Sequence, residues 1–535
     1  EVVVTADGMV VDSLTEQFGI RSLEFSPEFG FKLNGKKIFL QGNANHHDLG
    51  ALGATCYDKA IERMMLQLKS FGYNCIRCSH NPYSDSFARI ADRVGILVVD
   101  ELTDKWSDND YWGGRQPFTH IWHKLITEWI KRDRNRPSII LWSLGNELQI
   151  REGWAGFEGT NDWGITTYNI FNQLVKRWDH TRLTTVAMFP ARAGAITRHD
   201  KEFNDYLVPP ELACATEVAS FNYQSDKYDA YLKYRPDLIL FQSEAETSNL
   251  LQPYYNMDKE RMVGIAYWGS VEYWGESNKW PKKGWNYSFF EHTMRPYPQA
   301  YLIKTAFMPE IPEVHIGVVD AAGAESVSWN DVIVGRMALN ECWNHTPGSR
   351  RSLFTFTNAH SVELLVNGQS MGIQKNDTTR ANLRNMIYWK DVPYGNGGSV
   401  VAIARDKSGK EVARHRIETA GKAVALRIEA ETPTDWKADG MDLQYINVTV
   451  IDKKGRPVWD YNEPLTLQME GAARLVALDN GDHYTDELFH GITSKRMYQG
   501  RMQIILRSDQ EAGNVTVKIS SAGLKGTLRL KTIKE

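Results

Sequence analysis

Two glutamates, Glu147 and Glu244, each end a long apolar run of this chain. Apart from Ser143, residues 139–144 are apolar, and residues 238–241 are apolar as well. A run without polar alternation is typical of a strand buried on both faces, as in a parallel sheet wrapped by helices. Two carboxylates that face each other across an aromatic-rich cleft suit cleavage of a glycosidic bond. One protonates the leaving oxygen, and the other attacks or stabilises the anomeric carbon.

Eight apolar runs of strand length alternate with amphipathic helical segments. The runs are residues 38–43, 75–80, 96–101, 139–144, 184–188, 218–223, 238–244 and 263–268. Helices are expected at residues 61–71, 87–94, 118–132, 163–178 and 228–234, and Gly72 and Gly95 are the expected stops of the first two. Eight strand–helix repeats in about 280 residues predict a (β/α)8 TIM barrel. A doubly wound open sheet is the alternative, but no glycine-rich phosphate loop follows the first strand.

Polar residues end most of these predicted strands. In a closed barrel the carboxyl ends of all strands face one mouth, so such side chains would converge on one site. A lone glutamate at a strand exit is more often a capping residue, and this convergence is what favours a catalytic interpretation of Glu147 and Glu244. The accompanying polar and aromatic residues include Asn45, His46, His47, Asp48, Arg77, His80, Asn81, Asp100, Glu101, Asp104, Asn146, Asn222, Tyr223, Gln242, Ser243 and Trp268.

The rest of the chain reads as β-structure. Residues 1–29 look like the end of a β-domain, and residues 30–312 form the predicted barrel. Beyond it the helical periodicity fades, and short alternating segments appear with hairpin signals such as Asn367-Gly368 and Ser408-Gly409. We therefore expect two β-sandwich (immunoglobulin-like) domains, at residues 313–422 and 423–535.

The composition excludes some partners. A net charge of −4 on 535 residues provides no electrostatic case for nucleic acid or an anionic membrane surface. No run of eighteen apolar residues is present, so we expect no transmembrane helix. The 17 Trp and 23 Tyr residues offer flat apolar faces with polar edges, which suit sugar rings. The expected partner is a carbohydrate, and homo-oligomerisation is left open.

Metal binding is not expected. His46 and His47 are adjacent, and successive side chains of a strand point to opposite faces. Cys75 and Cys78 form a C-x-x-C pair inside an apolar strand, without a second pair to complete a zinc site. We predict neither a metal nor a cofactor.

The motifs, taken together, resemble glycoside hydrolase family 2, the family of β-galactosidases, β-glucuronidases and β-mannosidases. The resemblance covers almost the whole chain, with the closest likeness to its bacterial β-galactosidase branch. It rests on GNANHHDLGALGA (42–54), IRCSHNPYS (76–84), LVVDE (97–101), WSLGNE (142–147) and FQSE (241–244), which occur in the family's order. The resemblance implies that residues 1–29 are the end of an immunoglobulin-like β-sandwich domain. In that family a jelly-roll domain normally precedes this one, and we expect the jelly-roll domain to be absent from this chain.

The resemblance implies roles for individual residues. Glu147, in the Asn-Glu pair, corresponds to the general acid/base, and Glu244 corresponds to the nucleophile. Asn146 would bind the sugar 2-hydroxyl. We expect the substrate-binding set to comprise His46, Arg77, His80, Asp104, Asn146, Tyr223, Trp268 and Trp280.

The chain departs from the family pattern in two places. The seventh-strand motif often continues SET, but here it reads SEAET, which leaves Glu246 as a rival nucleophile. The Asn-x-Lys-Gly expected of a β-glucuronidase is replaced by Pro281-Lys282-Lys283-Gly284. The loss of the Asn argues against uronides, and the surrounding segment is more similar to the galactosidase branch, although Glu272 stands where that branch usually has Asp.

We therefore expect a retaining exo-β-glycosidase that releases terminal β-D-galactosides from oligo- or polysaccharides through a covalent glycosyl-enzyme intermediate. The alternatives are a β-glucuronidase or other family 2 β-glycosidase, or a catalytically inactive carbohydrate-binding protein on the same scaffold. A periplasmic or secreted bacterial location is the expectation.

Overall fold

The computed structural model describes residues 1–106, 117–148, 162, 164–189, 208–247, 251–277, 280–320, 325–329 and 332–534. The chain divides into two compact units. The first unit comprises Glu1–Ala44, Asn74–Ala245 and Met257–Ala266. The second unit comprises Asn45–Tyr73, Glu246–Asn256 and Tyr267–Glu535.

Eight strands close into a parallel barrel, in the order β10-β11-β12-β13-β6-β7-β8-β9. This confirms the predicted (β/α)8 barrel and excludes the open sheet. All eight residues of β9 are buried, as expected of a strand covered on both faces. The strands are β6 (Leu40–Asn45), β7 (Cys75–Cys78), β8 (Leu97–Glu101), β9 (Ile139–Asn146), β10 (Leu183–Met188), β11 (Val218–Asn222), β12 (Leu240–Ala245) and β13 (Gly264–Trp268).

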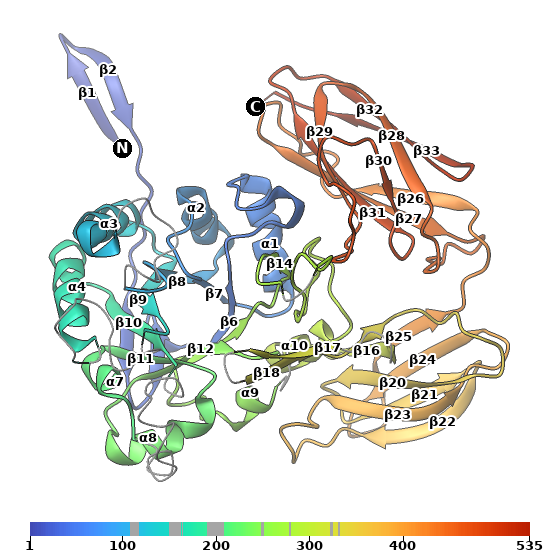
Figure 1. Cartoon of the computed structure of the whole chain (residues 1–535), viewed down its shortest axis with the longest axis horizontal. Helices are drawn as coiled ribbons and strands as arrows, with labels where there is room; N and C mark the ends of the chain where they lie inside the picture. The colour runs from blue at the N-terminus through green and yellow to red at the C-terminus, as the bar shows by residue number, and fades with distance from the viewer. Residues whose placement is uncertain are drawn as a thin grey trace. The chain divides into compact units, whose positions relative to one another are not determined.

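Helices of the first unit lie outside its barrel strands (Figure 1). They are α2 (Asp85–Val94), α3 (Phe118–Asp133), α4 (Ile165–Trp178), α7 (Glu211–Ala215) and α8 (Tyr228–Tyr234), with the 3-10 turn η3 (Ser225–Lys227). Helix α2 illustrates how local sequence sets the bounds. The Ser84 side chain accepts a hydrogen bond from the Phe87 amide at 3.2 Å, and Gly95 ends the helix with a φ of 75°.

The second unit contains the remaining helices and two successive β-sandwiches, as predicted. The helical elements are η1 (Gly50–Leu52), α1 (Asp58–Ser70), α9 (Gln252–Asn256) and α10 (Ala300–Phe307). The first sandwich pairs the sheet β19-β16-β20-β23 with β22-β21-β24-β25. Its strands are β16 (Val314–Val319), β19 (Leu339–Asn340), β20 (Arg350–Thr357), β21 (Ser361–Val366), β22 (Gln369–Lys375), β23 (Met386–Pro393), β24 (Ser399–Arg405) and β25 (Glu411–Glu418).

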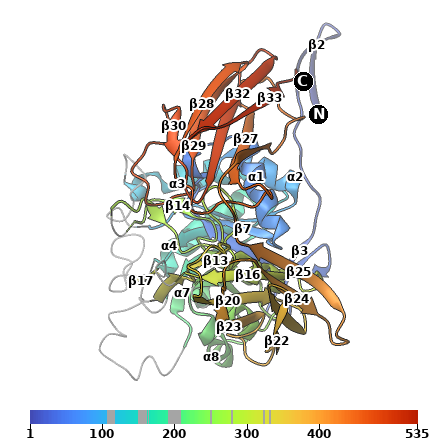
Figure 2. The same cartoon turned by 90° about the vertical axis from the view of Figure 1, so that its right-hand side faces the viewer.

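The second sandwich pairs the sheet β26-β27-β31-β29 with β30-β28-β32-β33, around a core that contains the fully buried Trp436. Figure 2 shows β28, β32 and β33 side by side, in agreement with their antiparallel pairing. Its strands are β26 (Ala425–Ala430), β27 (Leu443–Ile451), β28 (Pro464–Gly471), β29 (Ala473–Asp479), β30 (Ser494–Arg496), β31 (Arg501–Ser508), β32 (Asn514–Ser521) and β33 (Leu524–Lys531).

Smaller sheets complete the described part of the chain. They comprise the exposed hairpin β1 (Val2–Ala6)–β2 (Met9–Leu14), the sheet β3 (Leu23–Ser26)–β4 (Gly30–Leu33)–β5 (Lys36–Lys37), and the pairs β14 (Tyr273–Trp274)–β15 (Gly284–Trp285) and β17 (Glu325–Trp329)–β18 (Val332–Arg336). The domain boundaries after residues 29, 312 and 422 stay predictions. Within the described residues, no helix combines the length and apolarity needed to span a membrane.

Close packing of β13 against β6 leads to a stability prediction. A Cβ added at Gly264 would lie 2.4 Å from both the Cβ and the backbone oxygen of Leu40. Because backbone atoms cannot move aside cheaply, Gly264→Ala should destabilise the fold by about 1–3 kcal/mol, the usual cost of overpacking. Urea unfolding followed by tryptophan fluorescence measures this as a lower midpoint. Gly421→Ala, whose new Cβ would meet its nearest atom at 3.4 Å, is the control, and equal midpoints would contradict the prediction.

Candidate active site

A buried guanidinium lies at the centre of the site in the first unit. Arg77, on β7, has no exposed surface. Its Nη1 donates to Glu244 Oε1 at 2.7 Å, and its Nε and Nη2 donate to Glu101 Oε2 at 2.9 and 2.7 Å. Burial would lower the pKa of Arg77, but the two carboxylates raise it above its ordinary value. Arg77 therefore links the ends of β8 and β12 as a permanent cation.

Glu244 is held on both of its carboxylate oxygens. Arg77 donates to Oε1, and the Tyr223 hydroxyl donates to Oε2 at 2.7 Å. Only 3% of Glu244 is exposed. Two donors on different oxygens fix the rotation of the carboxylate, so the strand presents it in one orientation.

Glu147 follows β9 directly and is buried, with 4% of its surface exposed. The Asn222 amide nitrogen donates to its Oε1 at 3.3 Å. Both Glu147 and Tyr223 have left-handed backbones, with φ of 47° and 59°. This conformation is unfavourable for bulky residues and is found most often where a site imposes it. Each strained residue here directly follows a barrel strand and directs its side chain to the same cluster.

Asn146, the last residue of β9, connects these groups. Its Oδ1 accepts hydrogen bonds at 3.0 Å from both Arg77 and Asn222. Its Nδ2 donates to Asp104 Oδ1 at 3.1 Å and lies 3.3 Å from His80 Nε2. The amide is thus positioned by four side chains, which come from three different barrel strands or the segments after them.

Charges around His80 shift its pKa. Its Nδ1 lies 2.6 Å from Glu101 Oε1. Burial by itself would lower the pKa of His80, but Glu101 and then Asp104 outweigh it and raise the pKa. For Glu101, burial would raise the pKa, but Arg77 and His80 lower it. Glu101 and His80 thus each favour the charged form of the other.

The structure brings seven predicted site residues together in the first unit: Arg77, His80, Asp104, Asn146, Glu147, Tyr223 and Glu244. The three other predicted residues belong to the second unit. There His46 and Trp268 pack edge to face, 5.0 Å between ring centroids, and His46 Nε2 lies 3.5 Å from Glu276 Oε1. Trp280 is 76% exposed. The rival Glu246 is half-buried and also belongs to the second unit. The roles of all these residues stay predictions.

Comparison with known proteins identifies the family. The model "Glycosyl hydrolases family 2, TIM barrel domain" matches residues 28–261, and "Glycoside hydrolase family 2 C-terminal domain 5" matches residues 426–528. Together they cover more than half of the chain. The chain belongs to glycoside hydrolase family 2. This confirms the family that the sequence motifs predicted. A domain of unknown function matches residues 348–413.

Family 2 relatives carry two different names. A "Beta-galactosidase BoGH2A" of Bacteroides ovatus is 27% identical over 96% of this chain and 64% of its own length. A "Putative beta-glucuronidase" of Formosa agariphila is 44% identical over 98% of this chain and 51% of its own length. The chain thus spans about half to two thirds of these curated relatives. A crystal structure of a family 2 member from Bacteroides cellulosilyticus matches with a TM-score of 0.86 and 27% identity, over 99% of this chain and 67% of that one.

Two polar residues of this family 2 site, Glu101 and Asn222, were recognised at strand ends but not placed in the predicted substrate-binding set. Glu101 contacts both Arg77 and His80, and Asn222 contacts both Asn146 and Glu147. Their position directly at a strand end was the available signal. Among the described residues, groups of three or more possible metal ligands occur only in the second unit.

The His80–Glu101 contact leads to a pKa prediction. Glu101→Gln should lower the pKa of His80, because it removes the carboxylate that contributes most to raising it. Titration of isotope-labelled histidine by NMR measures the change. Asp104→Asn is the matched control and should lower the pKa of His80 less, because Asp104 makes the smaller contribution. An unchanged His80 pKa in Glu101→Gln would show that Glu101 does not control its protonation.

Proposed function

We propose that this chain carries the active site of a retaining β-glycosidase, with Glu244 as nucleophile and Glu147 as general acid/base. The observation that carries the proposal is a pair of buried glutamates at the ends of β9 and β12 with unlike partners. Glu244 is bonded to a guanidinium and a phenol, whereas Glu147 accepts a hydrogen bond from a neutral amide. Carboxyl groups in different surroundings can take the separate roles of acid and nucleophile.

Glu244 is suited to attack. Arg77 and Tyr223 each donate a hydrogen bond of 2.7 Å to one of its two oxygens. The carboxylate is therefore already oriented before it attacks the anomeric carbon, and it loses little rotational freedom in doing so. Attack forms a covalent glycosyl-enzyme and releases the leaving group. Membership of family 2, which the sequence motifs and both family models support, agrees with a mechanism of this type.

Glu147 is suited to proton transfer. It donates a proton to the leaving oxygen in the first step and removes one from the attacking water in the second. Asn146, directly before it, would donate its amide to the sugar 2-hydroxyl. The hydrogen bonds that Asn146 receives from Arg77 and Asn222 orient this amide, because they fix which end carries the donor.

Substitution of the two glutamates separates their roles. Glu244→Gln should abolish turnover of all substrates, because the amide cannot form the glycosyl-enzyme. Glu147→Ala should slow substrates with poor leaving groups by about 10²–10⁴-fold and spare those with good ones, which need little protonation. Azide should restore its activity, since this anion attacks the intermediate without a general base. Steady-state kinetics on a series of aryl β-glycosides measures these effects.

Glu246→Gln is the matched control, because it makes the same Glu-to-Gln replacement at a glutamate two residues away. It should retain most of the activity. If instead Glu246→Gln is inactive and Glu244→Gln is active, the nucleophile is wrongly assigned. If the wild-type chain hydrolyses no aryl β-glycoside, the inactive carbohydrate-binding alternative holds.

For the substrate we propose a neutral β-D-galactoside in the innermost subsite. A uronide carries a carboxylate, and burial of an unpaired charge costs several kcal/mol. Pro281 stands where the family's uronide-binding device has Asn, and proline supplies no backbone donor. Lys282, next to it, is buried, and its Nζ already donates to Tyr287 OH at 3.1 Å. These observations leave few donors for a sugar carboxylate.

A β-glucuronide is the second candidate, and one observation favours it. The Nζ of Lys283 is enclosed, and it has no hydrogen-bond partner among the described residues. It lies 5.1 Å from the centroid of the Trp280 ring. An enclosed ammonium group without an acceptor is suited to receive an anionic ligand. The relative that is 44% identical to this chain is also named a putative β-glucuronidase.

Relative hydrolysis of 4-nitrophenyl β-D-galactoside and β-D-glucuronide decides between the two. We expect the higher kcat/KM on the galactoside, because an uncharged sugar needs no matched cation. Lys283→Met tests the reason and should leave galactoside turnover unchanged. A clear preference for the glucuronide that Lys283→Met removes would overturn the galactoside proposal.

A further inference from the structure

A second cluster of titratable side chains lies in the second unit. Its members are Glu272, four residues after β13, His292, between β15 and α10, and His483, four residues after β29. No more than 4% of any of them is exposed, and their potential ligand atoms all lie within 4.8 Å of one another. One carboxylate and two imidazoles at this spacing are a typical donor set for zinc.

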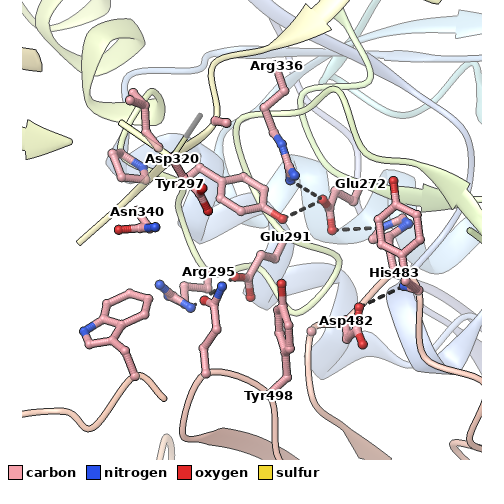
Figure 3. A pocket seen from close by; sticks show the side chains of 17 residues that line it. Glu272, Glu291, Arg295, Tyr297, Asp320, Arg336, Asn340, Asp482, His483 and Tyr498 are labelled. Carbon is pink, nitrogen blue, oxygen red and sulfur yellow. Dashed lines mark hydrogen bonds and ion pairs between the residues drawn. The ribbon is translucent and has the colours of Figure 1, made fainter. Parts of the chain in front are cut away.

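Glu272 presents its two oxygens to different partners. Oε1 accepts a hydrogen bond from Tyr297 OH at 2.7 Å and lies 3.7 Å from Arg336 Nη1. Oε2 lies 3.1 Å from His292 Nδ1 and 2.8 Å from His483 Nε2. Figure 3 shows Tyr297 and Arg336 on one side of Glu272 and His483 on the other. Only Oε2 therefore faces both imidazoles.

His292 is oriented from behind by a second carboxylate. Its Nε2 lies 2.9 Å from Asp479 Oδ1, and Asp479 is itself buried. A carboxylate that accepts a hydrogen bond from the outer nitrogen of an imidazole is the usual support of a metal-ligating histidine, because it fixes the ring and its tautomer. The inner nitrogen, Nδ1, then faces Glu272 Oε2.

His483 provides the third potential ligand atom of the cluster. Its side chain is buried, and neither of its ring nitrogens makes a hydrogen bond with the described residues. Nε2 lies 2.8 Å from Glu272 Oε2, in an ion-pair contact. Two atoms bound to one tetrahedral zinc lie about 3.3 Å apart without pointing at each other. Buried polar atoms are rarely left without a partner.

We propose that Glu272, His292 and His483 bind one Zn²⁺ ion, with Asp479 supporting His292. The two carboxylates, Glu272 and Asp479, supply negative charge that a divalent cation offsets. The ion would join the segments after β13 and before α10 to the loop after β29 of the C-terminal sandwich. Binding of the ion to the folded state would add to its stability. It is independent of the proposed glycosidase activity.

A second histidine–glutamate group, at His315, Glu341 and His415, supplies an internal control. His415 Nδ1 accepts a hydrogen bond from the Ile316 amide at 3.1 Å. Burial and then His315 lower the pKa of His415 to about 3, so the ring is neutral. A neutral ring that accepts at Nδ1 carries its proton on Nε2, the nitrogen that faces Glu341 at 3.8 Å. It therefore has no lone pair to offer a metal.

Metal analysis of the full chain, prepared without an affinity tag, tests the proposal. Protein stripped with a chelator and dialysed against zinc should retain one Zn²⁺ per chain and melt at a higher temperature than the stripped form. His483→Gln should weaken zinc binding at least about 100-fold, because loss of a supporting residue alone costs 10–100-fold. His415→Gln should bind zinc as the wild type does.

Cobalt titration of the stripped wild-type chain keeps the test decisive if His483→Gln does not fold. Four-coordinate cobalt bound to nitrogen and oxygen should absorb visible light and saturate at one equivalent. A folded wild-type chain that retains no zinc and shows no cobalt absorption would overturn the proposal, and a protonated His292 bridging two carboxylates would explain the cluster. Equal zinc affinity of folded His483→Gln and wild type would also overturn it. Hydrolysis assays on the stripped chain test the glycosidase proposal separately.

Discussion

The ion pairs of Arg77 with Glu101 and Glu244 are the interaction on which the candidate active site depends. A fully buried guanidinium is tolerated only when it is paired, and removal of one partner of such a pair typically costs about 3–5 kcal/mol. Arg77 lies on β7, and its two partners lie on β8 and β12. The interaction that neutralises charge inside the barrel is therefore also the one that orients the proposed nucleophile.

The backbone strain at Glu147 and Tyr223 is understandable in this setting. Each left-handed residue of this kind costs on the order of 1–2 kcal/mol. The Glu147 amide donates to Ala187 O at 2.6 Å, and the Tyr223 amide donates to Glu244 O at 2.8 Å. These bonds to the neighbouring strands offset the strain. They keep the side chains of Glu147 and Tyr223 directed into the site. An unstrained backbone at these residues would direct the side chains elsewhere.

Some relatives are named β-galactosidases and others β-glucuronidases, and the glutamate pair cannot explain this difference in substrate. β-Galactosidases and β-glucuronidases break the same type of bond, so one acid/base and one nucleophile serve both. Discrimination between a neutral sugar and a uronide requires a cation that faces the sugar carboxylate. Lys282 and Lys283 follow β13, and they differ in surroundings, since Lys282 contacts Tyr287 and the Nζ of Lys283 is enclosed near Trp280.

Local pattern alone was enough to predict the order of the eight strands and the positions of Glu147 and Glu244 at their ends. Strands covered on both faces leave continuous apolar runs, and Gly95 ends a helix through its left-handed backbone. Both signals are properties of neighbouring residues. The two β-sandwiches were predictable from turn dipeptides such as Asn367-Gly368, whose residues both have positive φ. Motif resemblance supplied the family.

Only the tertiary structure decided which strand-end residues meet. Arg77 and Glu244 are 167 positions apart, and Asn222 and Glu147 are 75 apart. The barrel brings both pairs into contact across strands that the sequence separates. The same packing of distant segments explains the contacts of Glu101. It also explains the buried cluster of Glu272, His292 and His483. A side chain's partners depend on how distant segments pack, and no local periodicity records that packing.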